Sequence, residues 1–182
     1  FDLDEDTNND GLCPFCIGNE SLIPQPIACY DINGNKIDKY DNKWQIKVIP
    51  NNKPILTIEG SILRKAEGIY DKMKGVGAHE ILIESQNHKV ETIKTENFVA
   101  SILAAQDRIN DLKNDLRFEY ILLFKNQGKA AGSTISHPHF QLVALPVIPK
   151  SAKEEMTISK RYYDFKERCL FCDIIDQEIS SG

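Results

Sequence analysis

The sequence contains no apolar run that approaches the roughly 20 residues needed to cross a membrane. No basic segment followed by a short apolar stretch, the pattern of a secretory signal peptide, is visible in it either. These two absences predict a cytoplasmic protein without a membrane partner.

Clustered positive charge is also missing. The 182 residues include 22 Lys and Arg against 27 Asp and Glu, which gives a formal net charge of -5, and no dense basic patch occurs. Proteins that bind nucleic acids need such a patch to neutralise the phosphate backbone. The composition therefore argues against a nucleic-acid partner, although not against a nucleotide. The acidic, polar segment 1–11 is expected to be mobile.

The five cysteines do not suit a disulfide framework, because their number is odd and no secretion signal accompanies them. Four of them form two C-x-x-C pairs, Cys13 with Cys16 and Cys169 with Cys172, whereas Cys29 stands alone and is expected to be a small buried residue. Two thiolates at this spacing can reach the same ion, and their softness favours zinc in a tetrahedral site.

The spacing alone leaves the other ligands of such a site open. Two of the four histidines can complete a Cys2His2 site with Cys13 and Cys16. Alternatively, all four paired cysteines form one site, which closes a loop of about 150 residues, far longer than the spacer of a common zinc ribbon. If each pair has its own ion, the histidines of the second site lie beyond Gly182.

Hydrophobic periodicity predicts an α+β protein with an antiparallel sheet and one long helix. Alternating or continuous apolar residues indicate strands over residues 44–49, 79–85, 120–124 and 140–145. Segments 68–77 and 126–134 have the composition of loops. After Thr95, an expected N-cap, apolar residues recur at helical spacing as far as Leu116. A second, charged helix is expected over 153–168.

The stretch SHPHFQ, residues 136–141, carries two of the four histidines. On a strand, residues i and i+2 point to the same face, so His137, His139 and Gln141 are expected to share one face. Three polar groups on one face of an otherwise apolar strand indicate that this face belongs to a functional site. Neutral imidazole is a good nucleophile near neutral pH, and its attack on phosphorus suits this arrangement.

Neutral donors for a phosphate group are available beside these histidines. The Gln141 amide can hydrogen-bond phosphate oxygens. The small-residue loop that precedes the histidines contains Gly132, Ser133 and Thr134, which can add backbone and hydroxyl donors. If a metal ion binds His137, it stiffens the strand and fixes the direction of His139.

Four motifs together resemble a known enzyme family: CPFCIGNE, VIPNNKP, FKNQGKAAGST and SHPHFQ. They are similar to those of the galactose-1-phosphate uridylyltransferase branch of the histidine-triad superfamily, which also includes ADP-glucose phosphorylase. The resemblance extends from Cys13 to Cys172. It implies a histidine-triad-like nucleotidyltransferase domain with a half-barrel sheet over 1–150. It also implies a linker helix and the truncated start of a second such domain over 151–182.

The same resemblance implies a role for individual residues. His139 matches the nucleophile of the family, and Gln141 matches the residue that contacts the phosphate. Asn51, Asn126 and Thr134 match nucleotide-binding positions.

The structural zinc site of the family matches Cys13, Cys16, His88 and His137. His88 is preferred to His79, which is expected to be structural or exposed. Cys169 and Cys172 match the first half of a second metal site.

Gln141 also bears on the type of reaction. Histidine-triad hydrolases have a third histidine at this position, which can donate a proton, whereas an amide can only hydrogen-bond. The resemblance therefore implies transfer from a nucleotide sugar, through a covalent nucleotidyl-histidine, to a sugar 1-phosphate or phosphate, with ping-pong kinetics. A hydrolase or phosphorylase with the same site and a non-enzymatic zinc module are the alternatives. A homodimer is the expected assembly, if any, because paired half-barrel sheets commonly associate.

Overall fold

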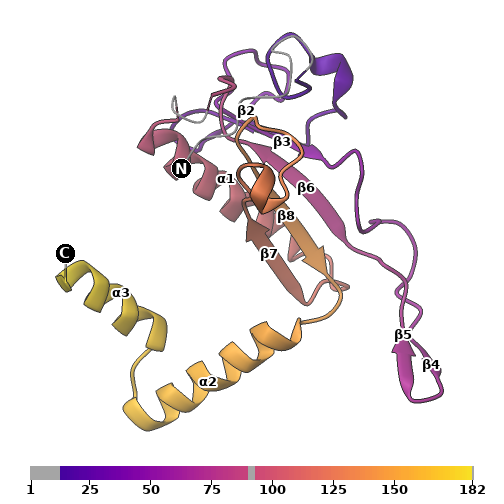
Figure 1. Ribbon diagram of the computed structural model, residues 1–182, viewed down its shortest axis with the longest axis vertical. Coiled ribbons are helices and arrows are strands. Elements are labelled where there is room, and N and C mark those ends of the chain that lie inside the picture. The colour runs from indigo at the N-terminus through magenta and orange to yellow at the C-terminus, as the bar shows by residue number, and fades with distance from the viewer. Residues whose placement is uncertain (1–12, 90–92, 182) are drawn as a thin grey trace. The chain divides into compact units, whose positions relative to one another are not determined.

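The computed structural model describes residues 13–89 and 93–181, so the acidic segment 1–11, expected to be mobile, lies outside the described residues. The chain divides into two compact units, Phe1–Pro146 and Val147–Gly182. The first unit contains a six-stranded sheet and the long helix (Figure 1).

The sheet has the strand order β2-β1-β3-β6-β8-β7, and each neighbouring pair in it is antiparallel. Its strands are β1 (Ala28–Tyr30), β2 (Lys36–Ile37), β3 (Ile46–Pro50), β6 (Ala78–Ile83), β7 (Tyr120–Phe124) and β8 (His139–Leu145). This arrangement confirms the predicted α+β class with an antiparallel sheet. The described residues also form two short 3-10 helices, η1 (Glu20–Leu22) and η3 (Lys129–Ala131).

Strand prediction succeeded for β3, β6, β7 and β8, which have five to seven residues, and failed for the strands of two or three residues, which are too short to show a hydrophobic pattern. The two short strands β1 and β2 were not predicted. Segment 68–77, expected to be a loop, contains part of a two-stranded hairpin of β4 (Lys65–Glu67) and β5 (Tyr70–Lys72). Gly68 forms its turn with a φ of 64°. All six residues of β4 and β5 are exposed, so no hydrophobic alternation marks them.

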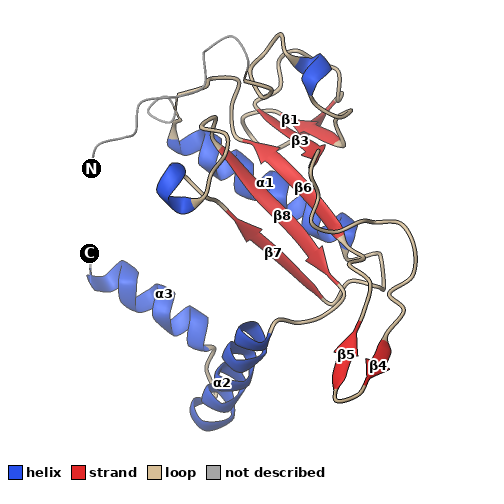
Figure 2. Cartoon of the chain, turned by 45° about the vertical axis from the view of Figure 1, so that its right-hand side comes forward, coloured by secondary structure: helices blue, strands red, loops and turns tan. Residues whose placement is uncertain are grey.

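The long helix α1 (Thr95–Leu112) lies across one face of the sheet and contacts β3 and β6 (Figure 2). Its sheet-facing side is built from small residues, because alanine lets the helix approach the strands closely. The buried alanines are Ala100, Ala104 and Ala105. Four of the larger apolar residues that predicted the helix are 41–50% exposed, namely Phe98, Val99, Ile102 and Leu103, whereas Leu112 is buried in the core on this face. The periodicity therefore identified the helix, but the face that packs on the sheet is formed mainly by the alanines.

The ends of α1 also differ from the expectation. Thr95 is the first helical residue and Lys94 occupies the N-cap position. Leu116 lies beyond the end of the helix and is 95% exposed.

In the second unit, the helix predicted over 153–168 is present as α2 (Lys150–Lys166), and Glu167, with a φ of 54°, is its C-cap residue. A further helix, α3 (Leu170–Ser181), follows.

Among the described residues, none of the helices combines the length and the apolar composition that crossing a membrane requires.

Side chains pack on both faces of the sheet. The core on the α1 face includes Ile46, Leu82 and Leu142. The core on the opposite face includes Trp44, Ile49 and Ile83, and it continues into Cys13 and Phe15. The second face therefore carries the C-x-x-C segment and the histidines of the predicted site.

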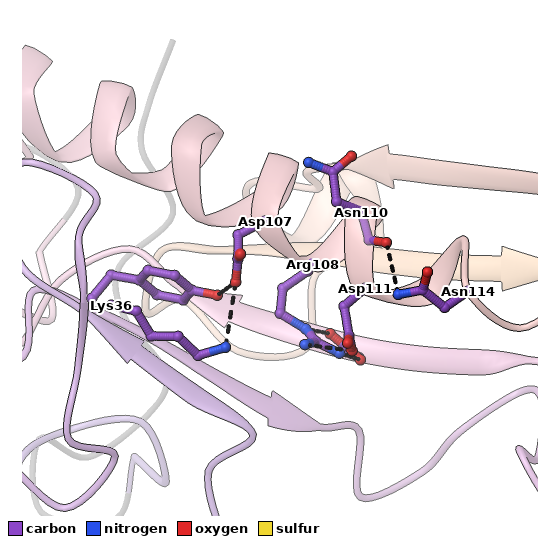
Figure 3. Close-up of polar contacts among 8 residues, drawn as sticks. Lys36, Asp107, Arg108, Asn110, Asp111 and Asn114 are labelled. Atoms are coloured by element: carbon purple, nitrogen blue, oxygen red, sulfur yellow. Dashed lines mark hydrogen bonds and ion pairs between the residues drawn. The ribbon is translucent and has the colours of Figure 1, made fainter.

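A buried ion pair joins α1 to β6. The Arg108 guanidinium donates two hydrogen bonds of 2.8 Å to the Glu80 carboxylate, and both residues are at most 5% exposed. Figure 3 shows Arg108 beside Asp111, whose carboxylate accepts a further contact at 2.9 Å. Burial opposes the charged form of Arg108, but the hydrogen bonds and charge of Glu80 outweigh it and raise the pKa of the guanidinium.

Loss of one partner of this pair should be costly, because it leaves the other buried without compensation. We expect Glu80→Gln to lower the free energy of unfolding by about 3–5 kcal/mol. The double variant Glu80→Leu/Arg108→Met should recover most of that loss, because no buried charge remains. Urea denaturation of the full chain measures both.

Asp111→Asn is the matched control, since it removes the exposed partner of the same guanidinium. Its expected cost is below about 1 kcal/mol. Equal destabilisation by Glu80→Gln and Asp111→Asn would contradict the importance of the buried pair.

Candidate active site and metal centre

The structure brings four of the predicted metal ligands together. One ligand atom from each of Cys13, Cys16, His88 and His137 lies within 4.8 Å of the others, and this is the one such group among the described residues. The Sγ atom of Cys16 is 3.3 Å from Nδ1 of His88 and 3.7 Å from Nδ1 of His137. Tetrahedral ligation by thiolate and imidazole separates sulfur and nitrogen by about 3.5 Å. The arrangement can therefore hold a metal ion.

Hydrogen bonds orient both imidazole rings. The Nε2–H group of His137 donates to the backbone carbonyl of Ser85 at 2.9 Å, which leaves Nδ1 as the ligand atom. The Nε2 atom of His88 lies 3.2 Å from the Ser136 hydroxyl, so this ring also turns Nδ1 toward the cysteines. These contacts are the kind that hold metal ligands in place in known metalloproteins.

His139 is the first residue of β8, so His137 lies just before the strand rather than on it. The Nδ1–H group of His139 donates to the backbone carbonyl of His137 at 2.8 Å. The lone pair of a neutral His139 is therefore on Nε2. The Phe15 ring stands edge-on to the His139 ring, with 5.3 Å between centroids, and helps to bury it.

The surroundings of His139 favour its neutral form. Burial lowers the pKa of its imidazole, and the nearby positive charge of Lys125 lowers it further. Lys125 in turn pairs with the fully buried Glu84, with 2.5 Å between Nζ and Oε1. Burial raises the pKa of that carboxyl group, and Lys125 acts against the rise. The sequence analysis predicted neither Lys125 nor Glu84 as a neighbour of His139.

Gln141 lies on the same face of β8 as His139, two residues further along. Its Oε1 atom is 2.9 Å from Nε2 of His79 on β6. Asn51, which follows β3, also contacts His79: its backbone N–H group donates to the His79 carbonyl, and its Nδ2 atom is 3.0 Å from Nε2. His79 is buried, so of the two alternatives expected for it, structural or exposed, the second does not hold.

The other predicted nucleotide-binding residues belong to the loop that precedes β8. Asn126 is partly buried, whereas Gly132 and Thr134 are exposed, and Gly132 ends η3 with a φ of 80°. The Ser133 hydroxyl donates to the Ile135 carbonyl at 2.8 Å, so that hydrogen is used within the loop. The Ser133 backbone N–H group also donates to the loop, at the Gly128 carbonyl.

The second C-x-x-C pair belongs to the second unit. Cys169 immediately precedes α3 and Cys172 is in its first turn, and both thiols are exposed. Because His88 and His137 complete the set of four ligands with Cys13 and Cys16, that site does not need the second pair.

Cys29 is fully buried, and burial raises the pKa of its thiol to about 11, which keeps it protonated.

Comparison with known proteins gives a family match and a set of relatives. Residues 50–148 match the family described as the N-terminal domain of the domain of unknown function DUF4931. The chain is 30% identical to ADP-glucose phosphorylase of Arabidopsis thaliana over 165 residues, which cover 88% of this chain and 45% of that protein. It is 24% identical to galactose-1-phosphate uridylyltransferase of Thermotoga maritima, covering 91% and 48%. The resemblance inferred from the motifs is confirmed.

Solved structures give the same fold. An ADP-glucose phosphorylase from Arabidopsis thaliana with bound ADP-glucose superposes with a TM-score of 0.73 and 27% identity, over 93% of this chain and 51% of that one. A galactose-1-phosphate uridylyltransferase-like protein of the same plant gives a TM-score of 0.72 and 29% identity, over 88% and 49%. The chain thus spans about half the length of the relatives it matches.

The clustered cysteines and histidines should retain a metal ion. We expect one ion per cluster in the full chain, lost on Cys16→Ser or His88→Ala, because three ligands hold it far more weakly. Chelation should lower the thermal unfolding temperature, since an ion that binds the folded state stabilises it. Elemental mass spectrometry and thermal unfolding measure these effects.

Cys29→Ala is the control variant, because it removes a buried thiol outside the cluster. It should leave the metal content unchanged. Retention of the full metal content by both Cys16→Ser and His88→Ala would exclude the cluster as the binding site.

Proposed function

The chain belongs to the DUF4931 N-terminal domain family, and we propose that its residues 1–150 form a nucleotidyltransferase domain in which His139 carries a nucleoside monophosphate. The hydrogen bond from His139 Nδ1 to the His137 carbonyl is the observation that supports this most directly. It leaves a nucleophilic Nε2 lone pair on a buried, neutral ring, which covalent catalysis at phosphorus requires.

The proposed reaction has two displacements. In the first, Nε2 of His139 attacks the α-phosphorus of a nucleotide sugar, the P–O bond to the second phosphate breaks, and the sugar 1-phosphate leaves. In the second, an oxygen of an acceptor phosphate attacks the same phosphorus and His139 leaves. His139 ends in its starting form, so the two half-reactions predict ping-pong kinetics.

Gln141 contributes hydrogen bonds rather than protons. Its amide can donate to a phosphate oxygen while charge develops there, and it has no acidic proton for a leaving group. A phosphate leaving group needs little protonation, whereas hydrolysis of a nucleotide amide or ester benefits from an acid. This supports transfer to a phosphate acceptor over hydrolysis.

The donor set of Cys13, Cys16, His88 and His137 suits zinc, since two thiolates and two imidazoles are soft or borderline ligands that favour tetrahedral geometry. In this proposal zinc is structural: it holds together the C-x-x-C segment, the loop after β6 and the start of β8. Cys169 and Cys172, within residues 151–182, remain the proposed first half of a second site in a second domain.

Nucleotide sugars and sugar phosphates are the proposed substrates, because the relatives are named as an ADP-glucose phosphorylase and as galactose-1-phosphate uridylyltransferases. Asn51, Asn126 and Thr134 are the proposed contacts to the nucleotide, with Gly132 and Ser133 shaping the phosphate loop. The acceptor is a sugar 1-phosphate or orthophosphate, which share the attacking phosphate oxygen.

A covalent adduct is the first expected result. The full-length chain, incubated with ADP-glucose or UDP-glucose, should gain the mass of one nucleoside monophosphate, on His139. His139→Asn should lower turnover by roughly 10³-fold or more, because the nucleophile is lost. Intact-protein and peptide mass spectrometry detect the adduct.

The His139→Asn variant should keep the metal content of the wild type, which shows that the loss is chemical rather than structural. Absence of an adduct with both nucleotide sugars, or an adduct that persists in His139→Asn, would falsify the proposed function.

The fate of the adduct separates transfer from hydrolysis. We expect the isolated nucleotidylated protein to be stable in buffer and to discharge rapidly when glucose 1-phosphate or orthophosphate is added. The reason is that the Gln141 amide does not activate water as an acid or base. Time-resolved mass spectrometry follows the loss of the adduct, and rapid discharge in buffer alone would favour the hydrolase.

A further inference from the structure

We propose that His79 is a positioning residue that holds the Gln141 amide with its N–H groups directed toward His139. The inference deepens the proposed function and rests on it. His79 is the second residue of β6 and is 8% exposed. In the register of β6 and β8, Ile83, Ile81 and His79 lie opposite His139, Gln141 and Val143, respectively.

This register fixes the order of the polar groups along the sheet. Residues opposite one another in an antiparallel pair share a face, and so do residues two apart on one strand. His79, Gln141 and His139 therefore lie on one face, with Gln141 between the two histidines. His79 reaches Gln141 diagonally, with 2.9 Å between Nε2 and Oε1.

The backbone assigns the tautomer of His79. The N–H group of Ile55 is directed at Nδ1 of the ring, at 3.3 Å, and a backbone N–H group can only donate. Nδ1 is therefore the acceptor, and Nε2 of the neutral ring carries the proton. An N–H donor at Nε2 requires an acceptor in Gln141, which only Oε1 supplies.

The Asn51 amide does not compete for this proton. Its Oδ1 atom accepts a hydrogen bond from the Lys53 backbone N–H group at 2.9 Å, so Nδ2 faces the imidazole. Nδ2 is 3.0 Å from Nε2 and 3.4 Å from Nδ1. Two such similar distances place it against the ring rather than in line with either nitrogen. Asn51 thus packs on His79 and leaves the Nε2–H···Oε1 bond intact.

The bond selects one of the two orientations of the Gln141 amide. A glutamine amide can rotate by half a turn and exchange its donor and acceptor ends. With Oε1 held by His79 on one side, the NH2 group is left for the other side, where His139 lies. In the opposite orientation Oε1 would face the oxygens of a phosphate on His139 and repel them. His79 therefore determines whether Gln141 stabilises or opposes charge at the phosphorus.

The first test does not depend on catalysis. Selective 15N labelling of histidine in the full chain reports which imidazole nitrogen of His79 is protonated. We expect protonated Nε2 and unprotonated Nδ1, and His79→Gln assigns the signals. A ring protonated on Nδ1 alone would overturn the proposal, because Gln141 would then have to present its NH2 group to His79.

The second test is a double-mutant cycle on the rate of His139 adduct formation at saturating ADP-glucose. His79→Phe keeps an aromatic ring without nitrogens and should lower the rate by roughly tenfold to hundredfold, less than the 10²–10³-fold typical of removing a transition-state donor outright. In the Gln141→Ala background, His79→Phe should have no further effect, because its target is gone. His79→Gln should restore part of the rate, since its amide can donate to Oε1.

A merely structural role for His79 predicts different results. In that case His79→Phe lowers the rate of adduct formation by the same factor in the wild type and in Gln141→Ala, and this outcome would overturn the proposal. An unchanged rate in the His79→Phe single variant would overturn it as well. Metal content and unfolding temperature of His79→Phe serve as controls on the fold. If the wild type forms no adduct, the proposed function fails, and the tautomer measurement still decides whether His79 holds Gln141.

Discussion

The pairing of β6 with β8 is the constraint on which the site depends. Its register sets Ile83 opposite His139 and Ile81 opposite Gln141, and a slip of one residue would turn each side chain of β8 to the other face. The end of this ladder also joins the segment after β6 to the residues before β8, through the Glu84 N–H bond to the Pro138 carbonyl. The two histidines of the cluster, His88 and His137, and the proposed nucleophile His139 are thus placed by one strand pair.

The two faces of the sheet carry different groups: one packs against α1, and the other carries the polar residues of the candidate site. On the α1 face, alanines and the Glu80–Arg108 pair hold the helix close to the strands. The other face carries His79, Gln141 and His139. Lys125 connects the two, because it pairs with the buried Glu84 and its charge also reaches His139. Lys125 is therefore placed where its charge acts on both the Glu84 carboxyl group and the His139 imidazole.

Much of this arrangement could be predicted from the sequence, because the longer strands carry alternating or continuous apolar residues and the cysteine and histidine motifs carry their own spacing. The side of α1 that packs on the sheet could not, since alanines and larger apolar residues both recur at helical spacing, and only tertiary packing selects between them. The hairpin of β4 and β5 buries nothing and leaves no periodic signal.

The proposed role of His79 did not follow from the sequence, for a related reason. It begins the run HEILI, whose three consecutive apolar residues predict a strand, but its neighbour on β8 follows only from the register. The signal available in the sequence was a polar residue on each of two predicted strands, His79 on one and Gln141 on the other. Without the pairing, a histidine at the start of a strand has no distinguishing mark.

His137 contributes to the site through its side chain and through its backbone, and only the first contribution depends on which amino acid stands there. Its ring offers Nδ1 to the cysteines, and this requires histidine or another ligand at that position. Its carbonyl accepts the N–H group of His139, and every amino acid has a backbone carbonyl. A lineage can therefore replace the residue at 137 and lose the metal site while the bond that orients the His139 ring persists. In proteins built on this strand pair, metal content and the tautomer of the histidine at position 139 can evolve separately.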